Sequence, residues 1–118
     1  MRQFLPAVCL CFAACADLPP ANDALDQARA VYVAVQADPL VTAYAPAELD
    51  LAGRTLSDAE RMWRGYAYPD EVAHQAYLAE QRSRIARETA RSRANEAETA
   101  KLAGQRRGDP TTGGTAPR

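Results

Sequence analysis

Apolar residues recur at helical spacing in three stretches of the chain. The first stretch covers residues 22–36, and its apolar positions are Leu25, Ala28, Val31, Tyr32 and Val35. The second runs from Pro46 to Gly65, and its apolar positions are Leu49, Ala52, Leu56, Ala59 and Trp63. Spacings of three and four residues predict an amphipathic helix in each stretch. We expect Pro39 to end the first helix and residues 42–45 to form a loop.

The third stretch, from Asp70 to Ala103, contains neither glycine nor proline and consists mostly of strong helix formers. It predicts one long helix. Its bulky apolar residues are Val72, Tyr77, Leu78 and Ile85, and beyond them the pattern is mainly alanine and charge. We therefore expect the first half to pack against the other helices. The distal half, residues 87–103, is expected to project and to contact a second copy or another envelope protein.

Together these stretches predict an all-α protein, a small three-helix hairpin or bundle with a long C-terminal helix that projects beyond it. Much of the 47% hydrophobic fraction is alanine, so few large side chains are available for a core. Residues 104–118 are rich in Gly, Pro, Thr and Arg, which predicts a disordered tail. The formal net charge is -1, with acids prevailing from Asp17 to Glu71 and bases from Val72 onward.

The first 14 residues have the composition of a signal peptide. Arg2 gives a short positive segment, and Phe4 to Ala14 form an apolar run, shorter than the roughly 20 apolar residues that span a bilayer. All three cysteines, Cys9, Cys11 and Cys15, lie in this opening part of the chain. We therefore expect no disulfide or metal framework in the body of the protein.

Phe12-Ala13-Ala14-Cys15 resembles a bacterial lipobox, in which small residues precede a cysteine that carries lipid. Cys9 and Cys11 lack this pattern. We expect cleavage before Cys15 and a membrane anchor on this cysteine, although Phe12 stands where leucine is more common. The alternative is cleavage at Ala14-Cys15-Ala16, which would release a protein that begins at Asp17.

Residues 15–21 include Pro19 and Pro20 and have no helical period, which is typical of a tether between the lipid and a helical domain over residues 22–103. The inner-membrane retention signal of enteric bacteria is an aspartate at the second mature position. Ala16 would occupy that position here, and Asp17 follows it. The sequence therefore favours the outer membrane, with the protein facing the periplasm.

The two C-terminal stretches resemble a bacterial envelope family called domain of unknown function 4398. The resemblance is carried by YAPAEL at residues 44–49, by Ala52, Leu56 and Ala59, and by AYLAEQRSRIA at residues 76–86, and it covers about residues 22–95. In that family a signal peptide, often of the lipoprotein type, precedes Ala- and Arg-rich helices. Some members continue into a peptidoglycan-binding OmpA-like domain. The resemblance implies an envelope protein, and it transfers no catalytic or ligand residue.

The residue types offer no constellation for catalysis. His74 is the only histidine, so neither a His/Cys metal cluster nor a Cys-His nucleophile can be assembled within one chain. Neighbouring acids such as Asp70 and Glu71 stand at a helix start, where they complement the helix dipole. We expect no enzyme, no cofactor and no metal. We also expect no nucleic-acid partner, because export separates the protein from nucleic acid.

Two groups of side chains are candidates for binding. Around the turn between the second and third helices lie the aromatic residues Trp63, Tyr66, Tyr68 and Tyr77. They either fill the end of an alanine core or form a patch for a glycan or a protein. Arg87 and Arg91 belong to an arginine-rich stretch, which is either solvated or directed at anionic headgroups or an acidic protein.

The sequence thus predicts a non-enzymatic, membrane-anchored envelope lipoprotein whose helices act as an adaptor or spacer. The alternative is a peptidoglycan- or glycan-binding module that uses the aromatic turn between Trp63 and Tyr68.

Overall fold

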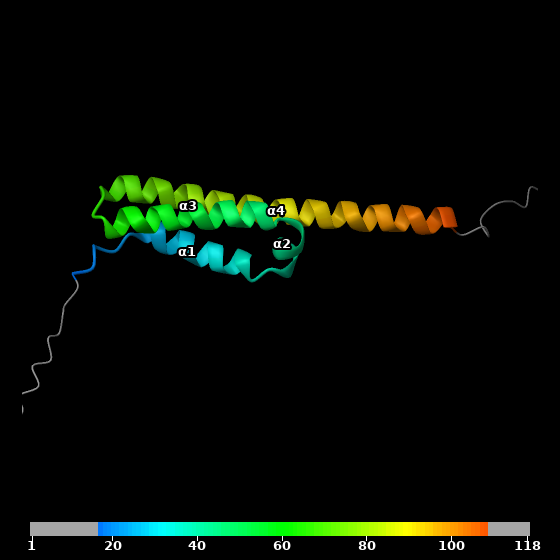
Figure 1. The fold of residues 1–118 in the computed structure, drawn as a ribbon, viewed down its shortest axis with the longest axis horizontal. Coiled ribbons are helices and arrows are strands. Elements are labelled where there is room, and N and C mark those ends of the chain that lie inside the picture. The colour runs from blue at the N-terminus through cyan, green and yellow to red at the C-terminus, as the bar shows by residue number, and fades with distance from the viewer. Residues whose placement is uncertain (1–16, 109–118) are drawn as a thin grey trace, which may run out of the picture.

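The computed structural model describes residues 17–108, and this part of the chain folds into helices without strands (Figure 1). The helices are α1 (Asp23–Gln36), α2 (Pro39–Tyr44), α3 (Pro46–Arg64) and α4 (Pro69–Gly108). α1 and α4 run in one direction and α3 runs in the opposite direction (Figure 1). The protein is all-α with a long C-terminal helix that projects beyond the others, as predicted.

The predicted signal peptide, residues 1–14, and Cys15 lie outside the described residues, as do residues 109–118 of the predicted tail. The first part of that tail, residues 104–108, is helical, so the prediction of disorder is wrong there. α4 begins at Pro69 and continues to Gly108. The helix therefore extends beyond the predicted end at Ala103. At about 1.5 Å per residue, a helix of this length is roughly 60 Å long.

The predicted loop over residues 42–45 is wrong, because most of it belongs to the short helix α2. The Asp38 carboxylate accepts a hydrogen bond from the Leu40 amide at 2.9 Å, and Pro39 occupies the first turn. An aspartate cap followed by proline is a helix start signal. Pro39 thus begins α2, and only Ala37 and Asp38 separate it from the end of α1. Val41 is buried and holds α2 against the bundle.

The core is built on a row of small side chains along α4, which we call the α4 seam. Its members are Val72, Ala76, Ala79, Ser83, Ala86 and Ala90, all buried. They follow one another at alternating spacings of four and three residues, which keeps them on one helix face. Most of these side chains end at Cβ, so the other helices can approach the α4 backbone closely.

The larger core side chains come from the three shorter helices. At one end of the seam, Leu25 of α1 and Leu56 of α3 pack in a cluster with Ala76 and Ala79. At the other end, Val35 of α1 and Val41 of α2 pack in a cluster with residues that include Ala86. The larger core side chains thus come from α1, α2 and α3, and in both clusters they pack together with small residues of α4.

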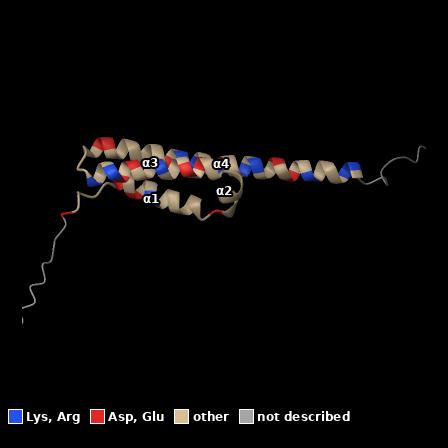
Figure 2. Cartoon of the chain, in the orientation of Figure 1, with Lys and Arg blue, Asp and Glu red and all other residues tan. Residues whose placement is uncertain are grey.

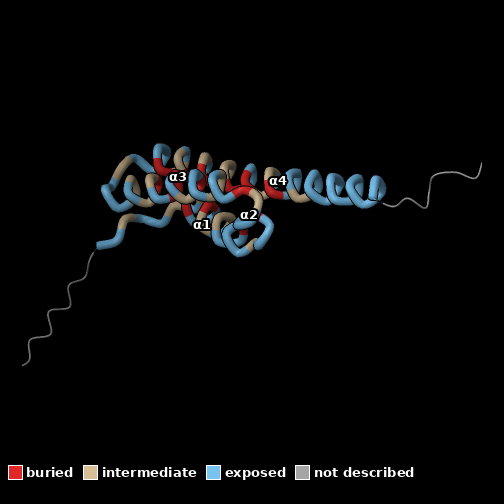
Figure 3. The backbone as a smooth tube through the Cα atoms, turned by 45° about the vertical axis from the view of Figure 1, so that its right-hand side comes forward, coloured by how far each residue is buried: buried red, intermediate tan, exposed pale blue. Residues whose placement is uncertain are grey.

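The core positions predicted for the long helix are partly wrong. Val72 is buried and Leu78 is half-buried, but Tyr77 and Ile85 are 55% and 56% exposed. The prediction followed side-chain size, whereas α4 turns its small residues toward its neighbours. Packing also continues beyond Ile85 to Ala90, and residues 95–108 are exposed (Figure 3).

The polar groups on the packed faces are satisfied. Ser83 on the seam donates its hydroxyl to the Ala79 carbonyl at 2.9 Å. Thr55 of α3 donates to the Leu51 carbonyl at 2.8 Å and accepts from Arg82 of α4. In residues 17–108, no buried side-chain nitrogen or oxygen lacks a hydrogen-bond partner. The small core therefore carries no desolvation penalty from an unpaired group.

Enlarging the seam should destabilise the fold. Ala79→Leu puts three extra carbons where the side chain is 1% exposed, and overpacking of this kind costs about 1–3 kcal/mol. The matched control is Ala97→Leu, at an exposed position of the same helix, which should change the free energy of unfolding by less than about 0.5 kcal/mol. Urea denaturation followed by circular dichroism measures both. Equal losses of unfolding free energy in the two variants would contradict the assignment of the α4 seam as the packed face of the helix.

Candidate functional site

The turn between α3 and α4 is a tight cap that ends α3 at Arg64. The Ala67 amide donates to the Met62 carbonyl at 3.0 Å, and the Tyr66 amide donates to the Trp63 carbonyl at 3.1 Å. This pair of bonds is the Schellman motif. The motif needs one residue in the left-handed region, and Tyr66 takes it with φ 57° although Gly65 precedes it. The predicted helix end is confirmed, but the strained residue is a tyrosine.

The strap, residues 17–22, lies against this turn. Trp63 donates its indole Nε1–H to the Pro20 carbonyl at 2.9 Å. Tyr66 donates its hydroxyl to the Asp17 carbonyl at 2.5 Å. The segment predicted as a tether is thus tied to the helical domain by the polar ends of two aromatic side chains.

Asn22 forms the third tie between the strap and the turn. Its side-chain amide nitrogen donates to the Pro69 carbonyl at 3.1 Å, at the start of α4. Its side-chain oxygen accepts from the Leu25 amide at 3.2 Å and so caps α1. Asn22 therefore caps α1 and also joins the beginning of α1 to the beginning of α4.

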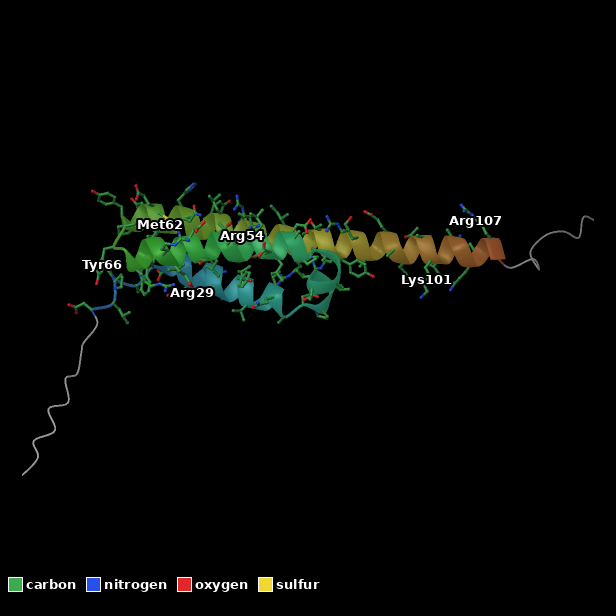
Figure 4. The ribbon with its side chains drawn as sticks, in the orientation of Figure 1. Arg29, Arg54, Met62, Tyr66, Lys101 and Arg107 are labelled. Carbon is green, nitrogen blue, oxygen red and sulfur yellow. The ribbon has the colours of Figure 1, made fainter. Side chains whose placement is uncertain are left out.

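Trp63 is held in place by Arg29 of α1. The Arg29 guanidinium carbon lies 5.3 Å from the centroid of the indole ring, within the range of a cation–π contact. Arg29 Nε also donates to Glu60 Oε1 at 2.9 Å, and Arg29 Nη1 donates to Asp26 Oδ1 at 2.9 Å. The hydrogen bond to Glu60, chiefly, raises the pKa of Arg29. The guanidinium therefore stays charged over the indole, and Figure 4 shows it at the turn end of the bundle.

A cavity of about 280 Å³ lies between the strap and the turn. Its lining includes Pro19 and Pro20 from the strap, Trp63 and Tyr66 from the turn, and Val72 from the seam. This volume is at the small end of the range for ligand pockets, and its walls are mostly apolar. A ligand here would contact the strap as well as the helices.

The structure brings only two of the four candidate aromatic residues to the cavity. Trp63 is half-buried and packs on the core, and Tyr66 is 63% exposed at the cavity wall. Tyr68 and Tyr77 are 77% and 55% exposed and do not line it. Of the four aromatic residues, Trp63 therefore fills the end of the core, and the three tyrosines do not. The strap contacts had no sequence signal, because their acceptors are backbone carbonyls.

The candidate arginines lie near the point where α4 leaves the bundle. Arg87 is half-buried, and Arg91 is exposed and paired with Glu88 at 3.0 Å. Arg93 makes the contact between helices. It donates to the Tyr44 carbonyl at 2.7 Å and pairs with Glu48 Oε1 of α3 at 2.7 Å. In sequence, Arg93 looks like the neighbouring arginines, and only the packing distinguishes it.

The remaining titratable side chains form no recognisable site within residues 17–108. No three His, Cys, Asp or Glu side chains in this part of the chain gather as potential metal ligands. His74 is exposed. None of the helices in the same range combines the length and the apolar character needed to cross a bilayer.

The ion pair at the end of the bundle should make stability depend on pH. The pKa of Glu48 is lowered, first by a hydrogen bond from its own backbone amide and second by Arg93. A lowered folded-state pKa stabilises the fold above the unfolded pKa of about 4.3, and this contribution is lost as pH falls through the folded value. Glu48→Gln should therefore flatten the fall in urea midpoint between about pH 5 and pH 3.

The control for this change is Arg93→Gln, which removes only the second cause and should flatten the profile less. A Glu48→Gln protein with the same pH profile as the native chain would contradict the interpretation.

One family model matches the helical part of the chain. The family described as Domain of unknown function (DUF4398) matches residues 23–102, from the first residue of α1 to the distal part of α4. No curated protein and no solved structure matches the chain significantly. The chain belongs to the DUF4398 family, as the residues of α3 and α4 predict.

Proposed function

We propose that this chain is a non-enzymatic lipoprotein of the bacterial cell envelope, anchored through Cys15, whose helices act as an adaptor or spacer. The observation that carries the spacer role is the shape of α4. It has 40 residues, and the three shorter helices pack on it only as far as Ala90 and Arg93. The remaining turns present their whole circumference to other molecules.

The anchor is supported by the residues before Cys15 and by the strap. Two peptide units separate Cys15 from Asp17, whose carbonyl Tyr66 binds. Two residues of chain reach at most about 7 Å, so a lipid on Cys15 would hold the α3–α4 turn near the membrane. Ala16 and Asp17 favour the outer membrane, with the protein facing the periplasm.

The distal part of α4 is the proposed contact surface for a second copy or another envelope protein. Both acids and bases lie along this part of the helix (Figure 2). Lys101 Nζ lies 4.0 Å from Glu98 Oε2, and Arg91 Nη1 lies 3.0 Å from Glu88 Oε1. Exposed pairs of this kind contribute little to stability. They keep the surface mixed in charge, which suits a protein partner better than nucleic acid.

The anchor is tested by metabolic labelling with a fatty-acid analogue. Cys15→Ala should abolish incorporation into the full-length chain in a bacterial host, because the thiol that carries the lipid is lost. Cys11→Ala, the matched control, should label normally. Labelling that survives Cys15→Ala and disappears with Cys9→Ala or Cys11→Ala would overturn the assignment.

Glycan binding at the aromatic turn is the second candidate, and the apolar cavity beside Trp63 is the observation that favours it. Against it, the indole N–H and the Tyr66 hydroxyl already bind the strap. Trp63 is the only tryptophan, so its emission reports on this cavity directly. The spacer role predicts no shift when peptidoglycan fragments are added, and a saturable shift would favour the glycan.

A further inference from the structure

Large exposed apolar side chains gather at the turn end of the bundle. Leu18 on the strap is 76% exposed, and Tyr66 and Tyr68 on the turn are 63% and 77% exposed. Trp63 is half-buried and lines the cavity together with Tyr66. We call these four residues the turn surface. A small domain with so few large core side chains leaves its most exposed leucine and its two most exposed tyrosines together at one end.

The charges around the turn surface do not make it basic. Asp17, Asp70 and Glu71 are exposed there. Arg61 and Arg64, in the last turn of α3, are paired with Asp58 and Glu60 respectively, at 2.5 Å and 3.3 Å. The turn surface therefore has no basic patch that would attract anionic lipid headgroups.

The chemistry of the turn surface suits the boundary between water and hydrocarbon. Tyrosine and tryptophan combine an apolar ring with one polar group, and they concentrate at the headgroup level of membranes. Here the polar groups of Trp63 and Tyr66 are already hydrogen-bonded to the strap backbone. Leu18 supplies an aliphatic side chain at the same end.

We propose that the turn surface lies in the headgroup region of the bilayer, and that α4 points away from it. This inference rests on the proposed lipid anchor at Cys15. Tyr66 and Trp63 hold the strap at the Asp17 and Pro20 carbonyls, so the anchored end of the chain and the exposed rings share one side of the domain. Contact with the membrane removes Leu18 and Tyr68 from water. The strap determines that this end of the domain, and not the other, faces the bilayer.

The orientation places the distal end of α4 far from the membrane. From Pro69 to Leu102 the helix rises about 50 Å at 1.5 Å per residue. Figure 4 shows Tyr66 at one end of the molecule and Lys101 and Arg107 toward the other. The proposed contact surface on distal α4 then stands at a fixed height, where a partner in the periplasm can reach it.

The single tryptophan provides the test. A chain that begins at Cys15 keeps all four helices, since α1 starts at Asp23, and Cys15 is then its only cysteine. Its thiol is coupled to a maleimide lipid in phosphatidylcholine vesicles that contain brominated lipids. We expect Trp63 emission to be quenched, most strongly by bromines near the headgroup. A second reporter, Leu102→Trp combined with Trp63→Phe, should show no quenching.

Two further variants separate the turn surface from exposed residues elsewhere. Leu18→Ser with Tyr68→Ser leaves the strap hydrogen bonds in place and should reduce the quenching of Trp63. The matched control, Leu40→Ser with Tyr77→Ser, removes one exposed leucine and one exposed tyrosine from other places and should leave the quenching unchanged.

Unquenched Trp63, or equal quenching of the two reporters, would overturn the orientation. Quenching that requires anionic lipid would also overturn it, because an electrostatic contact would then replace the apolar one. A concentration-dependent blue shift without vesicles would assign the turn surface to a second copy. Because the anchor is supplied chemically, these outcomes are independent of whether the cell attaches lipid to Cys15.

Discussion

Close approach of the three shorter helices to α4 is the constraint on which the rest of the structure depends. The α4 seam is made mostly of alanine, and the larger side chains Leu25, Leu56, Val35 and Val41 share the core with it. Each alanine contributes little apolar area by itself. The stability of such a core comes from fit, and a domain of this size has a small margin. Polar ties at the two ends of the bundle therefore matter more than they would in a larger protein.

These ties give the bundle two different ends. At one end Trp63 and Tyr66 bind the strap, and Asn22 at the end of the strap joins the starts of α1 and α4. At the other end Arg93 reaches across to Glu48 and the Tyr44 carbonyl, where α4 leaves its neighbours. Beyond that point α4 continues alone to Gly108. A rod that is fixed at one end and free at the other is the arrangement that a spacer needs, and it follows from where the seam stops.

The helices could be predicted from the sequence because their periodicity and start signals are local. Asn22, Pro46 and Gly65 mark boundaries by their own chemistry, and the structure has helix boundaries at each. The core of α4 could not be predicted in the same way. Side-chain size correctly favoured Val72 but also favoured Tyr77 and Ile85, while the rest of the packed face consists of alanine and serine. These small residues give no signal of burial in the sequence. The strap was missed for a different reason, because its acceptors are carbonyls of Asp17 and Pro20 and any residue supplies a carbonyl. Arg93 differs from Arg87 and Arg91 through its contacts with Glu48 and the Tyr44 carbonyl, which are far away in sequence.

Amide hydrogen exchange along α4 shows directly where the packed part of this helix ends. Packing on the seam should slow exchange from Val72 to about Arg93, because those turns open only when the bundle opens. The turns beyond Arg93 have no neighbour in the fold, and an isolated helix of this length is marginal in water. The account therefore predicts a steep drop in protection shortly after Arg93. Protection that ends near Ile85, or that continues evenly to Gly108 in the monomer, would contradict it.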